Sequence, residues 1–427
     1  MLLYFRLLRR LHFYYRPVLV ALVVFFLLDA LLVINSRPTT RVSPIVSRPN
    51  ALHTTKSPAQ NTTVFIVSVH RNTGAILRAA WNDAIMQLVS LLGPENVHFS
   101  AVEGGSQDYT KAALMELKGM LDSVGVSNTI SLGMTVWEQL AELETRPDPK
   151  REREAGWIWN DHDARYDLRR IPYLSKVRNQ AMEPLKQLER AGRKFDKVLW
   201  VNDVVFDAED FVTLLHTRDG RYAAACSMDF KVYPYYYDTF ALRDDLGRKT
   251  ASYYWPWFMS DSSRASVRHG DPVKVFSCWN GMVVFDAEPF YSEPPLRFRG
   301  VDDSLADLHL EASECCLIHA DNVLTSEPDK GVWLNPNVRV AYSVPTYRQV
   351  KRDRFPGAVA AVFGAWANRW SRAKGVMQYS LETQTVRTRL NKWKAETPPG
   401  ELTRMEVGEP CLINEMQIMW QNGWRHL

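Results

Sequence analysis

The chain of 427 residues has little of several features that define whole classes of protein. It holds only five cysteines, too few for a scaffold stapled by disulfides. It contains neither G-x-x-x-x-G-K-[ST] nor G-x-S-x-G, so P-loop nucleotidases and α/β-hydrolases lose their main sequence signal. An excess of one charge is also missing. The 52 Lys and Arg residues against 48 Asp and Glu leave a net charge of +4, which does not indicate nucleic acid as a partner.

Apolar and aromatic residues are present in ordinary amounts, 46% and 11% of the chain, which is enough to bury a core and excludes wholesale disorder. The mean hydropathy of -0.26 excludes a polytopic membrane protein but allows a single span. Length alone would accommodate two or three domains. The distribution of the apolar residues narrows this range.

The longest apolar run extends from Val18 to Ile34 and contains one charged residue, Asp29. Seventeen residues lie at the short end of what crosses a hydrocarbon core. The arginines that precede the run favour a cytoplasmic tail over residues 1–17 and a signal anchor over 18–34. A cleaved signal peptide is the alternative, but its apolar region would be shorter, and no small-x-small cleavage site follows Ile34.

Residues 35–63 are rich in Pro, Ser and Thr and predict a disordered stem without a core of its own. Asn61 begins the only N-x-[ST] glycosylation triplet, within this stem. The anchor, the stem and the triplet together predict a single-pass type II membrane protein whose bulk lies in the secretory lumen. In that oxidising compartment one or two disulfides are expected, and the odd number of cysteines leaves at least one thiol unpaired.

Beyond the stem, strands and helices alternate, which predicts an α/β fold with a parallel sheet. Short apolar runs rich in β-branched residues predict strands at 64–69, 97–102, 128–132, 197–201, 222–228 and 281–285. Helical spacing is found at 75–92, 111–124, 174–191 and 209–216. Ligands of such sheets bind at the carboxyl ends of the strands, so the polar residues that follow each strand are the candidates for function.

Two clusters have the chemistry to hold a nucleotide. Glu103 and Asp108 follow the second strand and flank two glycines, an arrangement that suits a base or a ribose hydroxyl. A plain turn explains the same residues equally well. Arg178 and Asn179 begin a helix, where an arginine fork can grip a diphosphate; a solvated surface arginine is the commoner case.

Asp203 follows the apolar strand 197–201 and is the candidate ligand for Mn²⁺ or Mg²⁺. Asp207 is better explained as the cap of the next helix. The turn Trp279-Asn280-Gly281 precedes another strand and suggests a loop packed closely on a substrate.

Acids further along are candidates for activating an acceptor, although most such residues lie on a surface by chance. They are Asp302, Asp303, Glu311 and Glu314. His319 and Asp321 could bind a metal, but a structural histidine is the more common case, and the cysteines lack the spacing of a zinc site.

The order of these clusters resembles that of GT-A glycosyltransferases. Several longer strings resemble the fungal capsule-associated α-1,3-mannosyltransferases of glycosyltransferase family 69, over about residues 64–347. These strings are HRNTGAILRAAW, RIPYLSKVRNQAMEPL, FDKVLWVNDVVF, YAAACSMDF, YDTFALRD, SCWNGMVVFDAEPFY, LRFRG, HLEASECCLIHADN and EPCLINEMQIMWQNGWRHL.

The resemblance implies a GT-A-like catalytic domain over 64–347 with a mostly parallel, Rossmann-like sheet, in a Golgi enzyme that uses GDP-mannose and a mannose-containing acceptor. Residues 348–427 would be an extension packed on that domain.

By position, Glu103 and Asp108 would bind the nucleoside, Arg178 and Asn179 would lie by the diphosphate, and Asp203 would meet the metal. The turn 279–281 would line the acceptor side, with Glu314 facing the sugar.

One departure from the family pattern concerns the metal. GT-A enzymes present D-x-D, whereas Val201 and Val205 stand two residues before and after Asp203. A single carboxylate implies weaker binding of a divalent ion. The departure leaves open a tethered glycan-binding partner without catalysis, and the fold leaves open a UDP-sugar donor.

Overall fold

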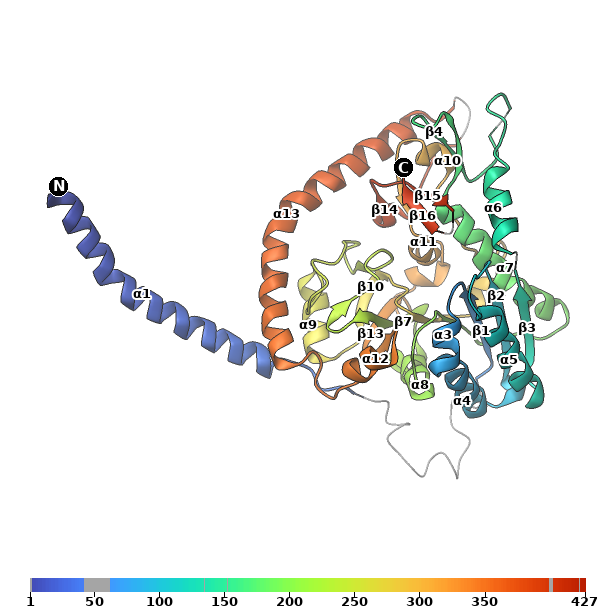
Figure 1. Cartoon of the computed structure of the whole chain (residues 1–427), viewed down its shortest axis with the longest axis horizontal. Coiled ribbons are helices and arrows are strands. Elements are labelled where there is room, and N and C mark those ends of the chain that lie inside the picture. Colours follow the sequence, from blue (N-terminus) through green and yellow to red (C-terminus); the bar gives the residue numbers. More distant parts are fainter. Residues whose placement is uncertain (1, 42–61, 134, 152, 399–401, 422) are drawn as a thin grey trace.

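The computed structural model describes residues 2–41, 62–133, 135–151, 153–398, 402–421 and 423–427 (Figure 1). The helices are α1 Leu2–Asn35, α3 Gly74–Ile76, α4 Asn82–Leu92, α5 Thr110–Ser123, α6 Val136–Glu144, α7 Arg170–Arg190, α8 Ala208–Leu215, α9 Asp261–His269, α10 Asp303–Ala306, α11 Glu314–Ala320, α12 Val344–Val350 and α13 Ala358–Ala395, with a π-helical turn Leu77–Trp81 joining α3 to α4.

The strands are β1 Val64–His70, β2 Val97–Glu103, β3 Ser127–Leu132, β4 Trp157–Asn160, β5 Arg165–Leu168, β6 Lys197–Val201, β7 Ala224–Val232, β8 Tyr235–Tyr236, β9 Arg243–Asp244, β10 Val273–Ser277, β11 Met282–Asp286, β12 Glu311–Ala312, β13 Val332–Ala341, β14 Leu412–Ile413, β15 Gln417–Trp420 and β16 Gly423–His426. All six strands and all four helices predicted above are present, with bounds shifted by a few residues.

The main sheet has ten strands in the order β3-β2-β1-β6-β11-β7-β13-β10-β9, with β8 paired to β7. The first four strands are parallel, as expected for a Rossmann-like half. β11 then enters antiparallel between β6 and β7, and β13 runs parallel to β7, so the complete sheet is mixed. This is the expected GT-A-like α/β architecture. Because β6 and β7 both run antiparallel to β11, their carboxyl ends lie at the same edge as those of β1 and β2.

The sheet is buried on both faces, which explains why its central strands are continuous apolar runs. Successive residues of β1 point to opposite sides: Phe65 belongs to one core cluster and Ile66 to the other. Helices α4, α5 and α8 cover the face of Ile66, and α7, α11, α12 and the start of α13 cover the face of Phe65. The hairpin β4–β5 lies outside the main sheet.

The N-terminal helix α1 contains a segment, Tyr15–Asn35, that is long and apolar enough to cross a membrane, with only 6% of its most apolar window buried. The predicted anchor 18–34 lies within it. The structure corrects the start of the predicted stem: Thr39 forms an isolated bridge with Arg354, and the backbone N–H of Arg41 donates to Asn337. Residues 36–41 therefore lie on the domain, whereas 42–61, with the glycosylation triplet's Asn61, are outside the described residues.

The C-terminal region returns to the domain after one long helix. The 38-residue helix α13 arches along one side of the molecule (Figure 1), and β14 beyond it pairs with β12. A disulfide between Cys316 of α11 and Cys411 fixes this return. A second disulfide joins Cys226 to Cys278, and Cys315 is free and buried, so the expected pattern of disulfides with one odd thiol is confirmed.

This pairing predicts the thiol count. The full chain, denatured without reductant, should react with one equivalent of thiol reagent, and with five equivalents after reduction.

Replacing Cys316 and Cys411 together with alanine should lower the free energy of unfolding by about 2–4 kcal/mol, because the crosslink closes a long loop of the unfolded chain. Chemical denaturation measures the loss. Five reactive thiols before reduction would contradict the pairing.

Candidate active site

The candidate site lies where the carboxyl ends of the central strands meet. Glu103 is the last residue of β2 and stands opposite His70 at the end of β1, while Asp203 follows β6 on the other side of β1. The spacing of neighbouring strands places these two acids on the order of 10 Å apart across β1. The prediction that polar residues gather at strand ends is therefore met at one continuous edge.

A buried ion pair occupies the centre of this edge. The Nε of Arg178 on α7 donates to Oε1 of Glu314 at 3.0 Å, and the side chains are 15% and 3% exposed. The guanidinium carbon lies 4.5 Å from the ring centre of Trp279, 5.4 Å from that of Trp200 and 5.7 Å from that of Phe298. Three aromatic faces and one carboxylate thus hold the cation. This arrangement suits a flat guanidinium better than an ammonium.

Glu314 owes its position to the start of α11. Ser313 is the N-cap, its hydroxyl accepting from the backbone N–H of Cys315, so that Glu314 is the first residue of the helix. Oε1 of Glu314 also accepts from the Cys315 thiol at 3.6 Å, whereas Oε2 takes no part in either contact. A carboxylate at a helix N-terminus is favoured by the helix dipole.

Three further acids lie near one another at this edge, where the charge of each acts on Tyr342, and sequence reasoning assigned a role only to Asp203. Burial raises the pKa of Asp203 to about 6. Asp229 lies in the last part of β7, where burial and the charge of Asp238 raise its pKa; it accepts from the Tyr342 hydroxyl at 2.9 Å. Burial, and also the charge of Glu314, raises the pKa of Asp238. A bound cation would offset the mutual repulsion of these carboxylates.

The signal that could have identified Asp229 is the one that identified Asp203, an acid at the end of an apolar strand. Asp238 gave no comparable signal because it sits in a loop beyond β8.

The turn Trp279-Asn280-Gly281 joins these groups. Asn280 and Gly281 both have positive φ, 57° and 82°, and a Cβ on Gly281 would stand 2.8 Å from a methyl carbon of Val340, so only glycine fits there. The backbone N–H of Asn280 donates to Asp238 at 3.2 Å, and the Trp279 indole N–H donates to the side chain of Asn202 at 3.1 Å. The side-chain nitrogen of Asn280 is buried without a hydrogen-bond partner.

The predicted nucleoside residues lie at the end of β2 and in the loop that follows it, and this loop is tied to the segment after β1. Glu103 is fully buried, and its Oε2 lies 3.4 Å from Nζ of Lys111. Asp108 accepts from the backbone N–H groups of Gly74 and Thr110, each at 2.9 Å. Burial acts to raise the pKa of Asp108, but these hydrogen bonds, with that of the Thr110 hydroxyl, outweigh it and lower the pKa. The Asp108 carboxylate therefore shapes the loop, while Glu103 stands at the strand end.

Other predicted residues are held by protein partners outside the Arg178–Glu314 pair. Both oxygens of Glu311 are bound by the fully buried Arg169, which also pairs with Asp303. Asn179 exchanges two hydrogen bonds with the backbone of Phe298, at 2.8 and 3.0 Å, and thereby orients the loop that supplies one wall of the aromatic cage. Asp210 accepts from the backbone N–H of Asp207, so the predicted N-cap of α8 is confirmed.

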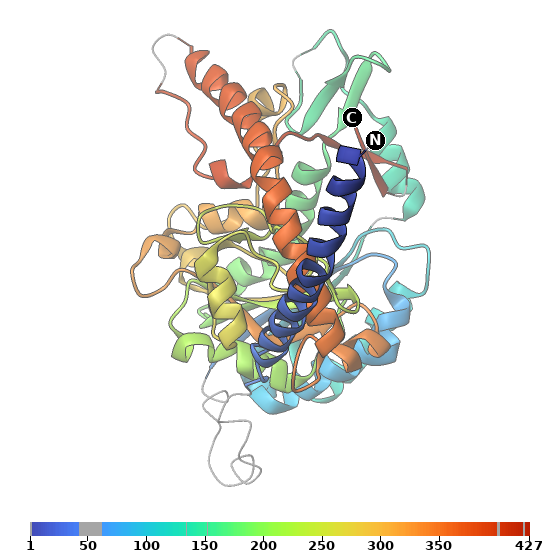
Figure 2. The same cartoon turned by 90° about the vertical axis from the view of Figure 1, so that its left-hand side faces the viewer.

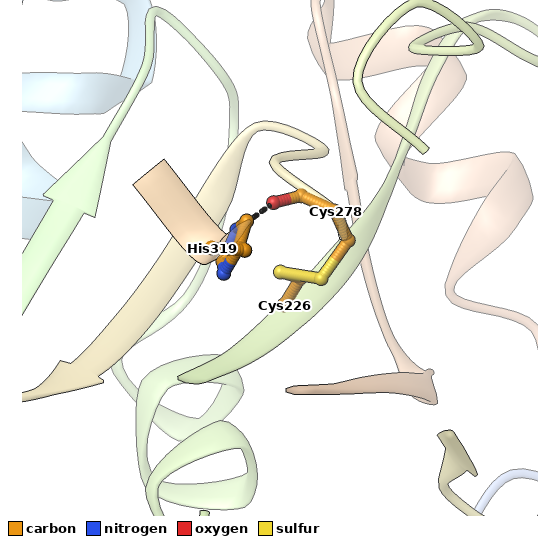
Figure 3. A group of neighbouring side chains, drawn as sticks. All are labelled: Cys226, Cys278 and His319. Carbon is orange, nitrogen blue, oxygen red and sulfur yellow. Dashed lines mark hydrogen bonds between the residues drawn. A yellow bond between two sulfur atoms is a disulfide. The ribbon is translucent and has the colours of Figure 1, made fainter. Parts of the chain in front are cut away.

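A second group with metal-binding residue types is structural. Among the described residues, Cys226, Cys278 and His319 form the one set of three potential ligands whose atoms lie within 4.8 Å of one another. Figure 3 shows the two sulfurs joined as a disulfide, which leaves no thiolate for a metal. His319 donates from Nε2 to the Cys278 carbonyl at 2.6 Å, and burial lowers its pKa to about 4. The structural interpretation of His319 is thus supported, and Asp321 pairs with Arg299.

A divalent cation fits the edge near Asp203 by its donor chemistry. Mn²⁺ and Mg²⁺ prefer carboxylate oxygens and commonly use one or two of them together with phosphate oxygens. Asp203 would supply the protein ligand. Asp229 and Asp238 lie close enough that their charges, together with that of Asp203, raise the pKa of Tyr342 beyond the effect of its burial.

Comparisons with known proteins identify a family. The family model described as Cryptococcal mannosyltransferase 1 matches residues 63–321. Alpha-1,3-mannosyltransferase CMT1 of Cryptococcus neoformans is 28% identical over 287 residues, which cover 64% of this chain and 56% of the relative. The chain thus matches a little over half the length of that protein.

Two solved structures are similar at low identity. Mannosyltransferase PcManGT from Pyrobaculum calidifontis, in complex with GDP-Man and Mn²⁺, is 10% identical with a TM-score of 0.36, over 90% of this chain and 87% of that one. Mannosyl-3-phosphoglycerate synthase from Rubrobacter xylanophilus is 11% identical with a TM-score of 0.32, over 93% of each chain.

The raised pKa of Asp203 predicts a pH-dependent gain in stability when the charge is removed. In the folded chain its pKa is about 6 against an ordinary value of 3.8, so its contribution to stability is complete below pH 4 and is lost as the pH rises through 6. With a chelator present, the free energy of unfolding of Asp203→Asn at pH 7.5 should therefore exceed that of the wild type by up to about 3 kcal/mol, and the variant should unfold at a higher temperature. Near pH 4 the two proteins should unfold at the same temperature.

Asp219→Asn is the matched control, because the Asp219 side chain is 93% exposed. Added Mn²⁺ should raise the unfolding temperature of the wild type and of this control, but not that of Asp203→Asn. A difference between Asp203→Asn and the wild type that is the same at both pH values would contradict the raised pKa, and equal Mn²⁺ shifts would contradict the ligand role.

Proposed function

Because the chain belongs to the family of cryptococcal mannosyltransferase 1, we propose that it transfers mannose from GDP-mannose to a hydroxyl of a mannose-containing glycan. The linkage is α-1,3 and the anomeric configuration is retained, in the synthesis of fungal capsule or cell-wall polysaccharide or of a glycoconjugate. The observation that carries the proposal is the Arg178–Glu314 pair, held by three aromatic rings at the sheet edge beside Asp238.

The donor occupies the side of the edge formed by β1, β2 and β6. Glu103 recognises the nucleoside, and Asp108 holds the loop around it in shape. Asp203 is the residue that would hold Mn²⁺ or Mg²⁺, and that ion supplies positive charge to the diphosphate of the leaving GDP. Arg178 adds a fixed positive charge by the diphosphate, and Asn179 positions the wall of its cage.

The acceptor occupies the side formed by the turn 279–281 and α11. In the reaction the bond between C1 of mannose and the phosphate oxygen breaks, and a bond from the acceptor oxygen to C1 forms as the hydroxyl gives up its proton. Of the acids expected to activate an acceptor, Glu314 is the one beside Arg178 and Asp238. The ion pair through Oε1 orients it and leaves Oε2 to face the sugar.

The protein acts as a single-pass type II enzyme of the Golgi membrane, with the domain in the lumen. The apolar segment Tyr15–Asn35 supports the anchor by its length and composition. The two disulfides support an oxidising compartment.

Two alternatives to this function are a non-catalytic role and a different sugar donor. The lone Asp203 in place of D-x-D favours a tethered glycan-binding partner without catalysis, and the buried Arg178–Glu314 pair speaks against it. A UDP-sugar donor is the other alternative. Thermal shifts of the full chain with Mn²⁺ and GDP, GDP-mannose or UDP separate the donors. The proposal predicts stabilisation by GDP and GDP-mannose, and a shift with UDP alone would overturn the donor assignment.

The catalytic role of Glu314 predicts a large loss of activity when its charge is removed. The purified full chain should transfer mannose from GDP-mannose to an α-mannoside in the presence of Mn²⁺. Glu314→Gln should lower kcat/KM by about 10²–10⁴-fold, the usual contribution of an acid–base group. Product formation with linkage analysis is the measurement.

Glu406→Gln is the matched control, because Glu406 makes a two-pronged pair with Arg299 and its side chain, 4% exposed, is almost equally buried. It should keep transfer within a few-fold of the wild type. If the two variants lose activity in proportion to their loss of thermal stability, Glu314 is structural. If the wild type neither transfers mannose nor releases GDP, the enzyme proposal fails.

A further inference from the structure

The first half of α13 exposes large apolar side chains in a helical stripe. Val359, Phe363 and Trp370 are 85%, 59% and 68% exposed, and Trp366, between the last two, is half-buried. Their spacing of four, three and four residues places all four on one face of the helix. We call these four residues the α13 stripe.

The opposite face of the same segment is made of small residues. Ala361, Gly364 and Ala365 are buried against the domain. A Cβ on Gly364 would stand 2.9 Å from the carbonyl oxygen of Trp255, so the helix is packed closely there. A helix on the surface of a water-soluble protein directs its large apolar residues inward. In this half of α13 the large apolar residues face outward and the small residues face the domain, which indicates an apolar environment on the outside.

The stripe is continuous with the membrane-spanning segment of α1. The ring centre of Phe26 lies 4.8 Å from that of Trp366, and the Arg369 guanidinium binds both oxygens of Asp29 at 2.7 and 2.9 Å. Figure 2 shows α1 crossing in front of this part of α13. The single acid of the anchor is thus neutralised by α13 itself, close to the end where α1 joins the domain.

The border of the stripe has the residues of a membrane interface. Tyr254 contacts Phe363 with ring centres 5.2 Å apart and contacts Tyr235 at the same separation, and Tyr253 is 56% exposed. Tyrosine and tryptophan gather at the level of lipid headgroups. Lys374 is exposed at the end of this half, where a cation meets anionic headgroups.

From this arrangement we propose that residues 358–374 of α13 lie in the headgroup–acyl boundary of the bilayer that α1 crosses. The stripe is immersed and the tyrosines lie at its rim. The partner is a lipid surface, because the stripe adjoins a helix whose own apolar side chains are exposed all along its spanning segment. The catalytic domain is then held against the membrane along α13 and does not hang from a free stem. The inference rests on the membrane anchoring proposed above, but not on the donor or the reaction.

The test places a fluorescent label at single positions of the full chain in nanodiscs that contain anionic lipid. Cysteine is introduced by Trp370→Cys, Phe363→Cys, Trp137→Cys or Leu22→Cys, since the native cysteines are paired or buried. Trp137 on α6 is the matched control: it is 79% exposed, and helix α6 lies on the far side of the molecule from α1 (Figure 1). Leu22 reports whether α1 itself is inserted.

Lipids that carry a nitroxide at a shallow acyl position should quench the labels at 363 and 370 at least about twofold more than the label at 137, with a blue-shifted emission. Quenching at 22 but not at 363 and 370 would overturn the docking of α13 and keep the anchor. No quenching at 22, 363 or 370 would overturn both. Self-quenching between labels at 370, without lipid quenching, would identify a second copy of the chain as the occupant and overturn the lipid assignment.

Discussion

The buried guanidinium of Arg178 is the charge on which the arrangement of the candidate site depends. A buried charge left without a partner costs several kcal/mol, so the chain must bring a carboxylate and polarisable surfaces to it. Glu314 supplies the carboxylate from the start of α11. Trp200, Trp279 and Phe298 supply the rings from a strand, a turn and a loop. Four other segments of the chain therefore converge on one cation, and their convergence fixes the sheet edge at which donor and acceptor would meet.

Much of this edge could be predicted from the sequence because its signals are local. Buried parallel strands are continuous apolar runs, and the rule that ligands bind at their carboxyl ends led directly to Glu103 and Asp203. The turn at Asn280 and Gly281 was visible because glycine before a strand indicates an unusual backbone, and both residues have positive φ. The switch to antiparallel pairing at β11 was not visible, since an apolar strand carries no mark of its direction.

Contacts between residues far apart in the sequence limit how much of the site could be predicted. Glu311 and Glu314 look alike as letters, yet one is bound by Arg169, 142 residues earlier in the chain, and the other by Arg178. Nothing local distinguishes a structural ion pair from one at a substrate. The same limit applies to α13: Arg369 on this helix pairs with Asp29 of α1, 340 residues earlier in the chain. At the α1–α13 contact and at the candidate site alike, an arginine joins two segments that are distant in the sequence.

The central claim is that Arg178 and Glu314 act as one unit in mannosyl transfer. A double-mutant cycle on kcat/KM tests it most directly, with the full chain, GDP-mannose, Mn²⁺ and an α-mannoside, and with Arg178→Lys, Glu314→Gln and the double variant. Residues that act as a unit are strongly non-additive, so each single variant should lose nearly as much activity as the double variant. Losses that add in free energy, or single variants that keep full kcat/KM, would contradict the account.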